Sequence, residues 1–200
     1  MTCEFFTDKI KRGDADGSQF HFAGLDEWLG VQPSTPGSCY NDFRERLFEP
    51  LGMDSSRYHL FDGMSDDPDA ECRKMDDYIK ANSGIDLMIV GIGMNGHIGF
   101  NEPGCDFNAW SHVADLEETT STVGQKYFQS PTKLDKGITI GFGHLRASKK
   151  VILIASGNAK ASIVYKSFKE PVTSTVPASI MQELPNGLVM LDAEAAVLLQ

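Results

Sequence analysis

The chain has 200 residues, of which 41% are hydrophobic and 23% charged, a composition typical of one globular domain. No stretch approaches the ~20 unbroken apolar residues of a membrane-spanning helix, and no secretory signal pattern follows Met1, so we expect neither membrane insertion nor secretion. The net charge of −10 argues against a nucleic-acid partner, because such proteins carry basic patches that neutralise phosphates.

Segments with helical periodicity alternate along the chain with short apolar or β-branched runs. Gly13 and Gly84 are placed to end helices, and Pro68 suits the first turn of one. In chain order, the pattern predicts a helix over 2–12, a strand over 20–25, a helix over 38–51, a strand over 58–61, a helix over 67–82, strands over 85–90, 138–140 and 151–155, helices over 159–168 and 178–184, a strand over 188–191 and a helix over 193–199.

Strands that alternate with helices indicate βαβ units and a parallel sheet. We therefore predict an α/β fold of the Rossmann-like, doubly wound type, with a mostly parallel sheet and helices on both faces. The run 85–90 reads as a strand buried on both sides. Because no linker divides the chain, residues 1–200 are expected to form a single domain.

The cysteines and histidines lack the spacings of metal sites. No CxxC, HxxxH or HExxH pattern occurs, so no metal is expected. Scattered thiols are typical of a reducing, cytoplasmic compartment. The residues concerned are Cys3, Cys39, Cys72 and Cys105, and His21, His59, His97, His112 and His144.

Polar side chains follow three of the predicted strands. In open α/β sheets, ligands bind beyond the carboxyl ends of the strands, so these side chains are expected to converge, although each alone is also typical of a solvated loop. The groups are Asp26 and Glu27, then Asn95, His97, Asn101 and Glu102, then Ser156, Asn158 and Lys160.

Residues 91–104 read GIGMNGHIGFNEPG, a glycine-rich turn that leaves the predicted strand 85–90. Gly91, Gly93 and Gly96 permit positive φ angles and close backbone approach. The GxGxxG spacing matches the dinucleotide fingerprint, but no helix opens behind it and no acidic ribose partner follows on schedule. We therefore expect no NAD and no other cofactor.

His97 and Glu102 lie five residues apart on this turn and form a candidate proton-transfer pair. Imidazole titrates near neutral pH, and a carboxylate within reach would orient it. The spacing fits equally well a loop histidine whose hydrogen bonds go to the backbone.

The same turn resembles the signature GxGxDGHIAFNEP of the glucosamine-6-phosphate deaminase/isomerase family. The resemblance runs in order over nearly the whole chain, and the HIGFNEPG ending is its most diagnostic part. The other similar segments are AGLDEWLGV at 23–31, SCYNDFRERLFEPLG at 38–52, DAECRKMDDYI at 69–79 and ITIGFGHLRASKKVILIASGNAKA at 138–161.

The resemblance implies a reaction between an amino-sugar 6-phosphate and water that yields a ketose 6-phosphate and ammonia, without metal or cofactor. Asp26 matches the carboxylate that moves a proton from C2 to C1 of the opened sugar. His97 matches the ring-opening histidine, and Glu102 matches its partner. Without the resemblance, the sequence favours a role for Asp26 as the N-cap of a helix formed by the residues after it.

Asn95 stands where the family usually has Asp. An amide keeps a hydrogen bond and loses a charge, and some relatives assigned to galactosamine 6-phosphate carry a similar MNGH. The resemblance therefore extends to that branch. Lys160 matches a phosphate-binding lysine at a helix N-terminus, and Lys126 stands where the family has Arg. The turn glycines Gly91, Gly93 and Gly96 are expected to face the substrate.

Three further expectations follow from the comparison with the family pattern. Against the family pattern, we expect the chain to begin after the family's first strand, helix, strand and phosphate loop, which would leave an exposed sheet region and weak or no catalysis. Residues 105–116 lack the basic groups of an allosteric amino-sugar phosphate site, so no such activation is expected. The expected partner is a small sugar phosphate, with a homo-oligomer left open.

Two other functions remain open at this stage. One is hydrolysis of a sugar lactone by a relative of the 6-phosphogluconolactonases, with His97 as the base that activates water. The other is non-catalytic binding of a sugar phosphate. Release of ammonia, release of acid, or binding without turnover distinguishes the three.

Overall fold

Parallel strands and flanking helices make up the computed structural model, which describes residues 2–200 and confirms the predicted α/β class. Its α-helices are α1 (Thr2–Lys11), α2 (Cys39–Phe43), α3 (Glu49–Leu51), α4 (Pro68–Ala81), α5 (Glu118–Gly124), α6 (Phe142–Ala147) and α7 (Ala161–Lys169). Its strands are β1 (Phe22–Ala23), β2 (Asp26–Trp28), β3 (Tyr58–His59), β4 (Met88–Val90), β5 (His112–Asp115), β6 (Lys136–Thr139), β7 (Val151–Ala155) and β8 (Gly187–Leu191). The other helical turns, of 3₁₀ or π type, are η1 (Arg44–Phe48), η2 (Ser55–Arg57), η3 (Gln125–Tyr127), η4 (Asn158–Lys160) and η5 (Pro177–Gln182).

The strands form three small sheets rather than one. Strands β4, β7 and β8 are parallel, with Val90 opposite Leu153 and Leu153 opposite Val189, and β1 pairs in parallel with β3. Strands β2, β6 and β5 form an antiparallel sheet in the order β2-β6-β5, which the sequence pattern did not predict.

The main hydrophobic core lies between the parallel sheet and the helices. Val90 and Leu153 pack in one buried cluster with Met75 of α4, Leu145 of α6 and Val164 of α7. The other side of the sheet exposes alternate apolar side chains, so the prediction that 85–90 is buried on both faces is wrong. The most exposed of them are Leu87, Ile89 and Met190, at 50%, 47% and 51%.

The predicted helix 38–51 is divided into three pieces. Ser38 caps α2 by accepting a hydrogen bond from the N–H of Asn41, and the chain then widens into the π-helical turn η1 before α3. Pro50 explains the division, because its ring lacks an N–H and clashes with the carbonyl four residues earlier in a regular helix. Gly52 ends α3 in the left-handed conformation.

Two predicted helices differ from the structure. The segment predicted as a helix over 193–199 forms turns over 193–198, in which Asp192 accepts from the N–H of Ala195, because so short a segment is marginal as a helix. The predicted helix 178–184 is the 3₁₀ segment η5. The sequence reading also omitted β5, α5 and α6.

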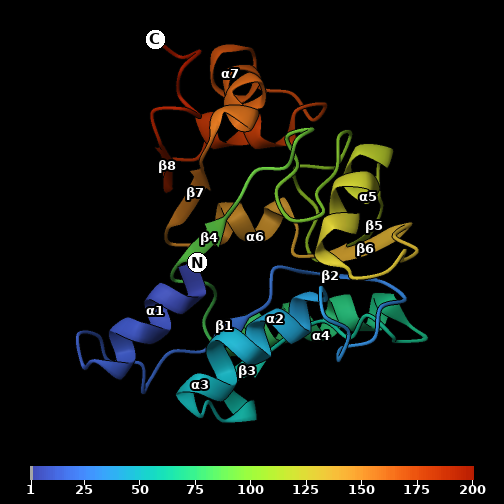
Figure 1. Cartoon of the computed structure of the whole chain (residues 1–200), viewed down its shortest axis with the longest axis vertical. Helices are drawn as coiled ribbons and strands as arrows, with labels where there is room; N and C mark the ends of the chain where they lie inside the picture. Colours follow the sequence, from blue (N-terminus) through green and yellow to red (C-terminus); the bar gives the residue numbers. More distant parts are fainter. Residues whose placement is uncertain (1) are drawn as a thin grey trace.

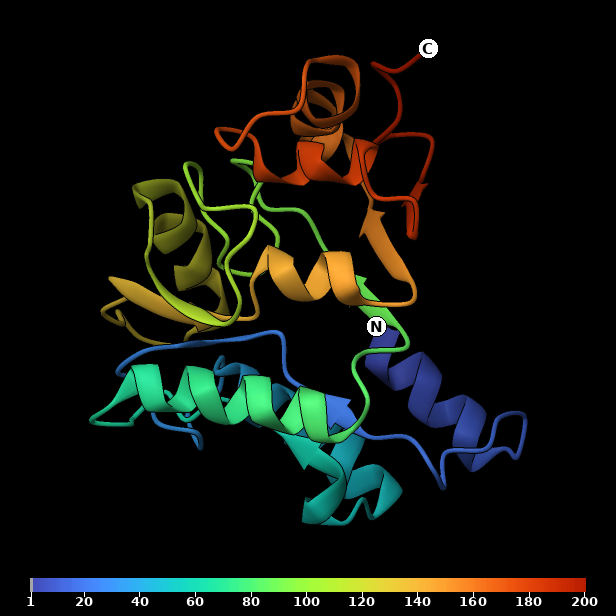
Figure 2. The same cartoon turned by 180° about the vertical axis from the view of Figure 1, so that it is seen from behind.

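The turn 91–104 enters the space between the parallel sheet and α5 (Figure 1). Helix α4 contacts β5 and β6 of the antiparallel sheet, and from behind it runs below that sheet (Figure 2). α4, with 14 residues, is the longest helix in the described part of the chain, and none there has the length and hydropathy of a membrane span.

Candidate active site

Five parts of the chain meet around a cavity of about 390 Å³. Asp26 comes from β2, Cys39 from α2, His97 from the turn after β4, Thr120 from α5 and Lys160 from η4. Of the polar groups expected to converge near the end of β4, Asp26, His97 and Lys160 line this cavity.

Asp26 opens β2 of the antiparallel sheet, whereas the sequence placed it at the end of a strand over 20–25. It lies opposite Thr139, whose hydroxyl accepts a hydrogen bond from the N–H of Phe100 and so ties the turn to the sheet. A β-carbon built on Gly99 would lie 3.4 Å from Oδ2 of Asp26, which places this oxygen beside the turn. Burial raises the pKa of Asp26 above its usual value, and a hydrogen bond from Cys39 and the charge of His97 oppose that rise.

Asp26 caps no helix, because residues 26–28 form β2; its neighbour Glu27 instead supports the start of α2, next to the N-cap Ser38. The buried carboxylate of Glu27 accepts hydrogen bonds from the backbone N–H groups of Trp28, Cys39 and Tyr40, at 2.9, 3.0 and 2.7 Å. Burial nevertheless raises the pKa of Glu27 to about 7, and the nearby charge of Asp26 adds to that rise. Glu27 thus fixes the start of α2 against β2.

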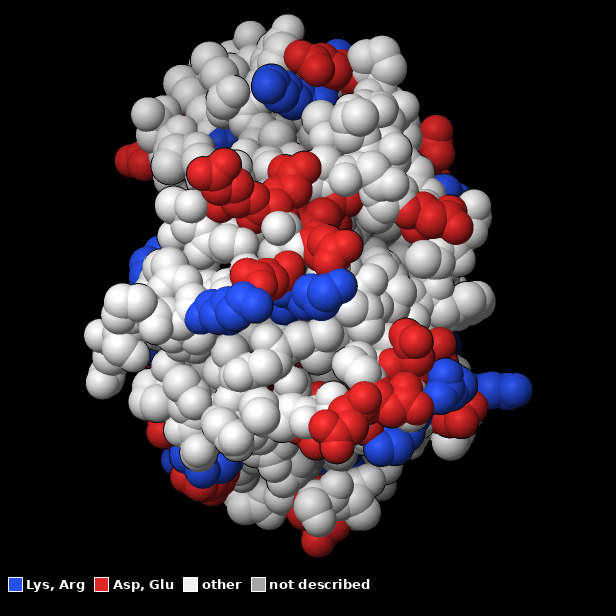
Figure 3. All heavy atoms as spheres, turned by 90° about the vertical axis from the view of Figure 1, so that its right-hand side faces the viewer, with Lys and Arg blue, Asp and Glu red and all other residues white. Residues whose placement is uncertain are grey.

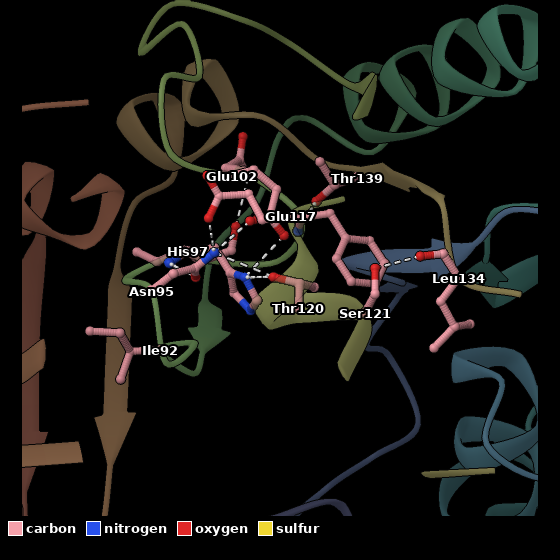
Figure 4. A network of polar contacts seen from close by, with 12 residues as sticks. Ile92, Asn95, His97, Glu102, Glu117, Thr120, Ser121, Leu134 and Thr139 are labelled. Carbon is pink, nitrogen blue, oxygen red and sulfur yellow. Dashed lines mark hydrogen bonds and ion pairs between the residues drawn. The ribbon is translucent and has the colours of Figure 1, made fainter. Parts of the chain in front are cut away.

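The ring of His97 is held through its Nδ1 atom. Nδ1 lies 3.0 Å from Oγ1 of Thr120 and 3.2 Å from Oε1 of Glu102, and these side chains converge in Figure 4. Burial raises the pKa of Glu102, but hydrogen bonds from His97, Thr120 and Asn95 outweigh it and leave the pKa lowered. The predicted pairing of His97 with Glu102 is therefore present.

Asn95 lies behind His97 and joins two carboxylates. Its side-chain N–H₂ donates to Oε2 of Glu102 at 2.7 Å and to Oε2 of Glu117 at 3.1 Å, and its oxygen accepts from the N–H of His97 at 3.2 Å. An aspartate here would have no N–H to donate. Glu117 is a site neighbour that the sequence reading missed.

The three turn glycines serve different purposes. A β-carbon on Gly93 would lie 2.3 Å from Cδ2 and Nε2 of His97, so the ring requires glycine there. Gly96 has a φ of +91° and packs against Ile163 and Val176. A β-carbon built on Gly91 would meet no atom within 4 Å beyond its chain neighbours, and Gly91 has no positive φ, so the expectation of strained or crowded backbone is wrong for it. Gly91 and Gly93 line the cavity.

Two lysines line the other side of the cavity. Lys160 lies at the start of α7 and donates from Nζ to the carbonyl of Ile92 at 2.6 Å. Burial lowers the pKa of Lys160, and the charge of Lys126 lowers it further, so the two ammonium groups repel each other. Lys126, on η3, is exposed, and its Nζ lies 5.1 Å from the ring centroid of Tyr127.

The backbone N–H groups before α7 are already engaged, contrary to their expected role in an anion site. The N–H of Gly157 donates to Asp192, at 3.1 and 2.9 Å from its two carboxylate oxygens, and that of Asn158 donates to Glu194 at 3.3 Å. Asn101, another predicted candidate, holds the turn to the backbone of Ile98 and Ile140. It is buried and is structural.

The sequence reading missed Thr120 and Cys39 as well as Glu117. No local motif marks any of them. Cys39 and Thr120 reach the cavity only through tertiary packing of α2 and α5 against the turn, and Glu117, at the start of α5, reaches Asn95 in the same way. Within residues 2–200, no group of three His, Cys, Asp or Glu side chains is arranged to hold a metal ion.

The face that carries β5 and β6 is mixed in charge. Lysine and arginine side chains lie next to aspartates and glutamates there (Figure 3). Lys133 pairs with Asp135 at 2.6 Å and Lys136 pairs with Asp115 at 2.7 Å. This face therefore offers no uninterrupted basic surface for a polyanion.

A family model described as glucosamine-6-phosphate isomerases/6-phosphogluconolactonase matches residues 2–190. Glucosamine-6-phosphate deaminase from Geobacillus sp. is 41% identical over 172 residues, which are 86% of this chain and 68% of the relative. Glucosamine-6-phosphate deaminase from Halothermothrix orenii is 37% identical over 190 residues, covering 94% of this chain and 79% of the relative.

Solved structures give the same result for the fold. A monomeric glucosamine-6-phosphate deaminase superposes with a TM-score of 0.92 at 31% identity, covering 98% of this chain and 82% of the other. A 6-phosphogluconolactonase from Trypanosoma brucei superposes with a TM-score of 0.65 at 19% identity, covering 90% of this chain and 73% of the other. The second likeness concerns the fold alone.

Proposed function

Because this chain belongs to the family of glucosamine-6-phosphate isomerases and 6-phosphogluconolactonases, we propose that it converts an amino-sugar 6-phosphate and water into a ketose 6-phosphate and ammonia. The observation that carries this proposal is the set of side chains that line the cavity. A carboxylate of raised pKa, a histidine tied to a second carboxylate, and two lysines face one space of about 390 Å³.

The lysines supply the phosphate subsite. Lys160 and Lys126 repel each other across the cavity, and a phosphate dianion between them would relieve that repulsion. The chain carries a net charge of −10, so placed cations of this kind are what an anionic substrate needs. A lysine binds phosphate as a point charge rather than through a bidentate fork.

His97 opens the sugar ring. Since Thr120 and Glu102 hold Nδ1, Nε2 is the nitrogen that acts on the substrate. It moves a proton between the anomeric hydroxyl and the ring oxygen, and the C1–O5 bond breaks to give the open-chain aldehyde. Asn95 keeps Glu102 in place during this step.

Asp26 then moves a proton from C2 to C1. Its carboxylate removes the C2 proton while the substrate's own ammonium group gives a proton to O1, which forms a neutral cis-enolamine. The resulting carboxylic acid then returns its proton to C1 and leaves an iminium at C2. The C2 iminium that results adds water and expels ammonia, which leaves the ketone. A buried carboxylate with a raised pKa suits this base, because it holds the proton more firmly than an exposed aspartate.

The reaction needs no metal or redox cofactor, since every step is a proton transfer, a hydration or an amine departure. The four free thiols favour a reducing compartment, and we place the protein in the cytoplasm on that basis. A small sugar phosphate is the partner that the cavity accommodates.

The test is a product assay with three substrates: glucosamine 6-phosphate, galactosamine 6-phosphate and 6-phosphogluconolactone. We expect ammonia and a ketose 6-phosphate in equal amounts from an amino sugar, and no catalysed acid release from the lactone. Acid release alone would establish the lactonase alternative. Binding of an amino-sugar phosphate without turnover would establish the sensor alternative.

The choice between the two amino sugars is proposed to depend on Asn95. The amide couples Glu102 to Glu117 behind the ring-opening histidine, so a charge change there alters the neighbourhood of the sugar. We expect Asn95→Asp to shift the ratio of kcat/KM values toward glucosamine 6-phosphate. An unchanged ratio would refute this role.

A further inference from the structure

The thiol of Cys39 lies against the proposed base. Its Sγ atom donates a hydrogen bond to Oδ1 of Asp26 at 3.3 Å. Cys39 is the first residue of α2, and its backbone N–H is held by Glu27 at 3.0 Å. Two neighbouring carboxylates of β2 thus fix both the main chain and the side chain of this cysteine.

The surroundings keep this thiol protonated. Burial raises the pKa of Cys39 well above its ordinary value, and the negative charges of Asp26, Glu27 and Asp42 raise it further. Reactive cysteines occupy electropositive sites with a lowered thiol pKa, which is the reverse of this environment. Cys39 is therefore a neutral hydrogen-bond donor and not a nucleophile.

The hydrogen bond from Cys39 gives the two carboxylate oxygens of Asp26 different surroundings. Oδ1 accepts from Cys39, whereas Oδ2 faces Gly99 on the turn that carries His97. Burial raises the pKa of Asp26, and the hydrogen bond from Cys39 is the larger of the two influences that oppose it, ahead of the charge of His97. A donor to the ionised form stabilises that form.

We propose that Cys39 is a positioning residue for the reaction, whose thiol orients the carboxylate of Asp26 and favours its ionised, proton-accepting form. The inference rests on the proposed function for its catalytic meaning. The contact between thiol and carboxylate is a property of the folded chain and can be measured without substrate. The charged or titratable groups around this contact are Asp26 and Glu27 from β2, Asp42 from α2, and His97 from the turn.

A packing role is the competing explanation, because Cys39 also touches the small hydrophobic cluster around Trp28 and Phe100. Three substitutions separate the two roles. Cys39→Ala removes the donor and volume, Cys39→Val removes the donor and keeps apolar volume, and Cys39→Ser keeps a donor. Cys72→Ala, which removes a buried thiol of α4 outside the cavity, is the control.

Two readouts should be taken for each protein. The first is the pH profile of kcat/KM for ammonia release, whose acid limb reports the base of the free enzyme. The second is titration of the Asp26 carboxyl carbon by NMR without substrate. We expect Cys39→Ala and Cys39→Val to raise the pKa of the acid limb and the pKa of Asp26 measured by NMR by about half a pH unit, because a weak donor to the carboxylate is lost. Cys39→Ser and Cys72→Ala should stay near the wild type.

The outcomes are distinguishable. If Asp26 titrates at the wild-type pH in both Cys39→Ala and Cys39→Val, the positioning role is wrong. An equal rise in Cys39→Ser would likewise assign the effect to packing. If the NMR shift occurs as expected but no protein releases ammonia, the contact is established and the proposed function is what fails.

Discussion

The ring of His97 occupies the space that a side chain at residue 93 would need. A β-carbon on Gly93 would lie 2.3 Å from Cδ2 and Nε2 of the ring and 2.6 Å from Cε1. The backbone of Gly93 also donates to the carbonyl of His97 at 2.9 Å, which closes the turn around the imidazole. The need for glycine at residue 93 is thus explained by the placement of a histidine.

Gly93→Ala is therefore expected to displace the imidazole while the fold is retained. A displacement of about 1 Å at a catalytic group lowers the rate by roughly 100-fold. NMR signals of the His97 ring should move together with the loss of kcat. Gly91→Ala, two residues away in open space, is the matched control and should leave those ring signals in place. Unchanged ring signals in Gly93→Ala would contradict the proposed role of this glycine.

Asn95 and Glu117 are expected to behave as a coupled pair. Asn95→Asp places a third carboxylate beside Glu102 and Glu117 and removes both donated hydrogen bonds, so activity and stability should fall. Glu117→Gln restores a donor that can face Asp at residue 95. The loss in the free energy of unfolding of the double variant should be smaller than the sum of the losses of the two single variants by about 1 kcal/mol or more.

Denaturant unfolding of the two single variants, the double variant and the wild type supplies this cycle. If the changes in the free energy of unfolding of the two single variants simply add in the double variant, residues 95 and 117 are not coupled.

Glu27 gives the stability of the chain a specific pH dependence. Its pKa is 4.5 without perturbation and about 7 in the fold, so the folded state holds the proton more firmly than the unfolded state. The associated stability is fully present below pH 4.5 and is lost as the pH rises through 7. At about 1.4 kcal/mol per pKa unit, the loss is roughly 3 kcal/mol.

Glu27→Gln removes this titration, although it also disturbs the hydrogen bonds to α2. The useful quantity is therefore the wild-type free energy of unfolding minus that of Glu27→Gln, measured at pH 4.5 and pH 8. We expect this difference to be larger at pH 4.5. A difference that is the same at both pH values would mean that Glu27 titrates normally in the fold.

Much of the fold could be predicted because its regular elements carry strong local signals. The helix predicted over 67–82 is α4, with Asp67 as its cap and Pro68 in its first turn, and the strand over 151–155 is β7. β5 was missed because HVAD has no clear alternation, and α6 because Gly141 and Gly143 weaken its helical pattern. Gly143 is needed there, since a β-carbon would lie 3.0 Å from the carbonyl of Ala109.

The part of the candidate site that lies within the single turn 91–104 could be predicted from the sequence. His97, Glu102 and Asn95 lie within a single turn, so their contact follows from local spacing. Thr120 and Cys39 reach the same cavity from α5 and α2, and only tertiary packing brings them there. Glu27 and Asp26 are neighbouring carboxylates in one strand with different roles. Glu27 accepts a hydrogen bond from the backbone N–H of Tyr40 in α2, whereas Asp26 accepts one from the thiol of Cys39 in the site. The sequence alone does not distinguish these two roles.

The proposed transfer of a proton from C2 to C1 by Asp26 can be followed with a deuterium label. An amino-sugar 6-phosphate deuterated at C2 is incubated with the wild type and with Asp26→Asn, and ammonia release and deuterium at C1 of the ketose product are recorded. We predict ammonia and C1 deuterium from the wild type, and a loss of turnover of roughly 100-fold or more in Asp26→Asn with substrate affinity retained. Turnover by Asp26→Asn at the wild-type rate would contradict this prediction.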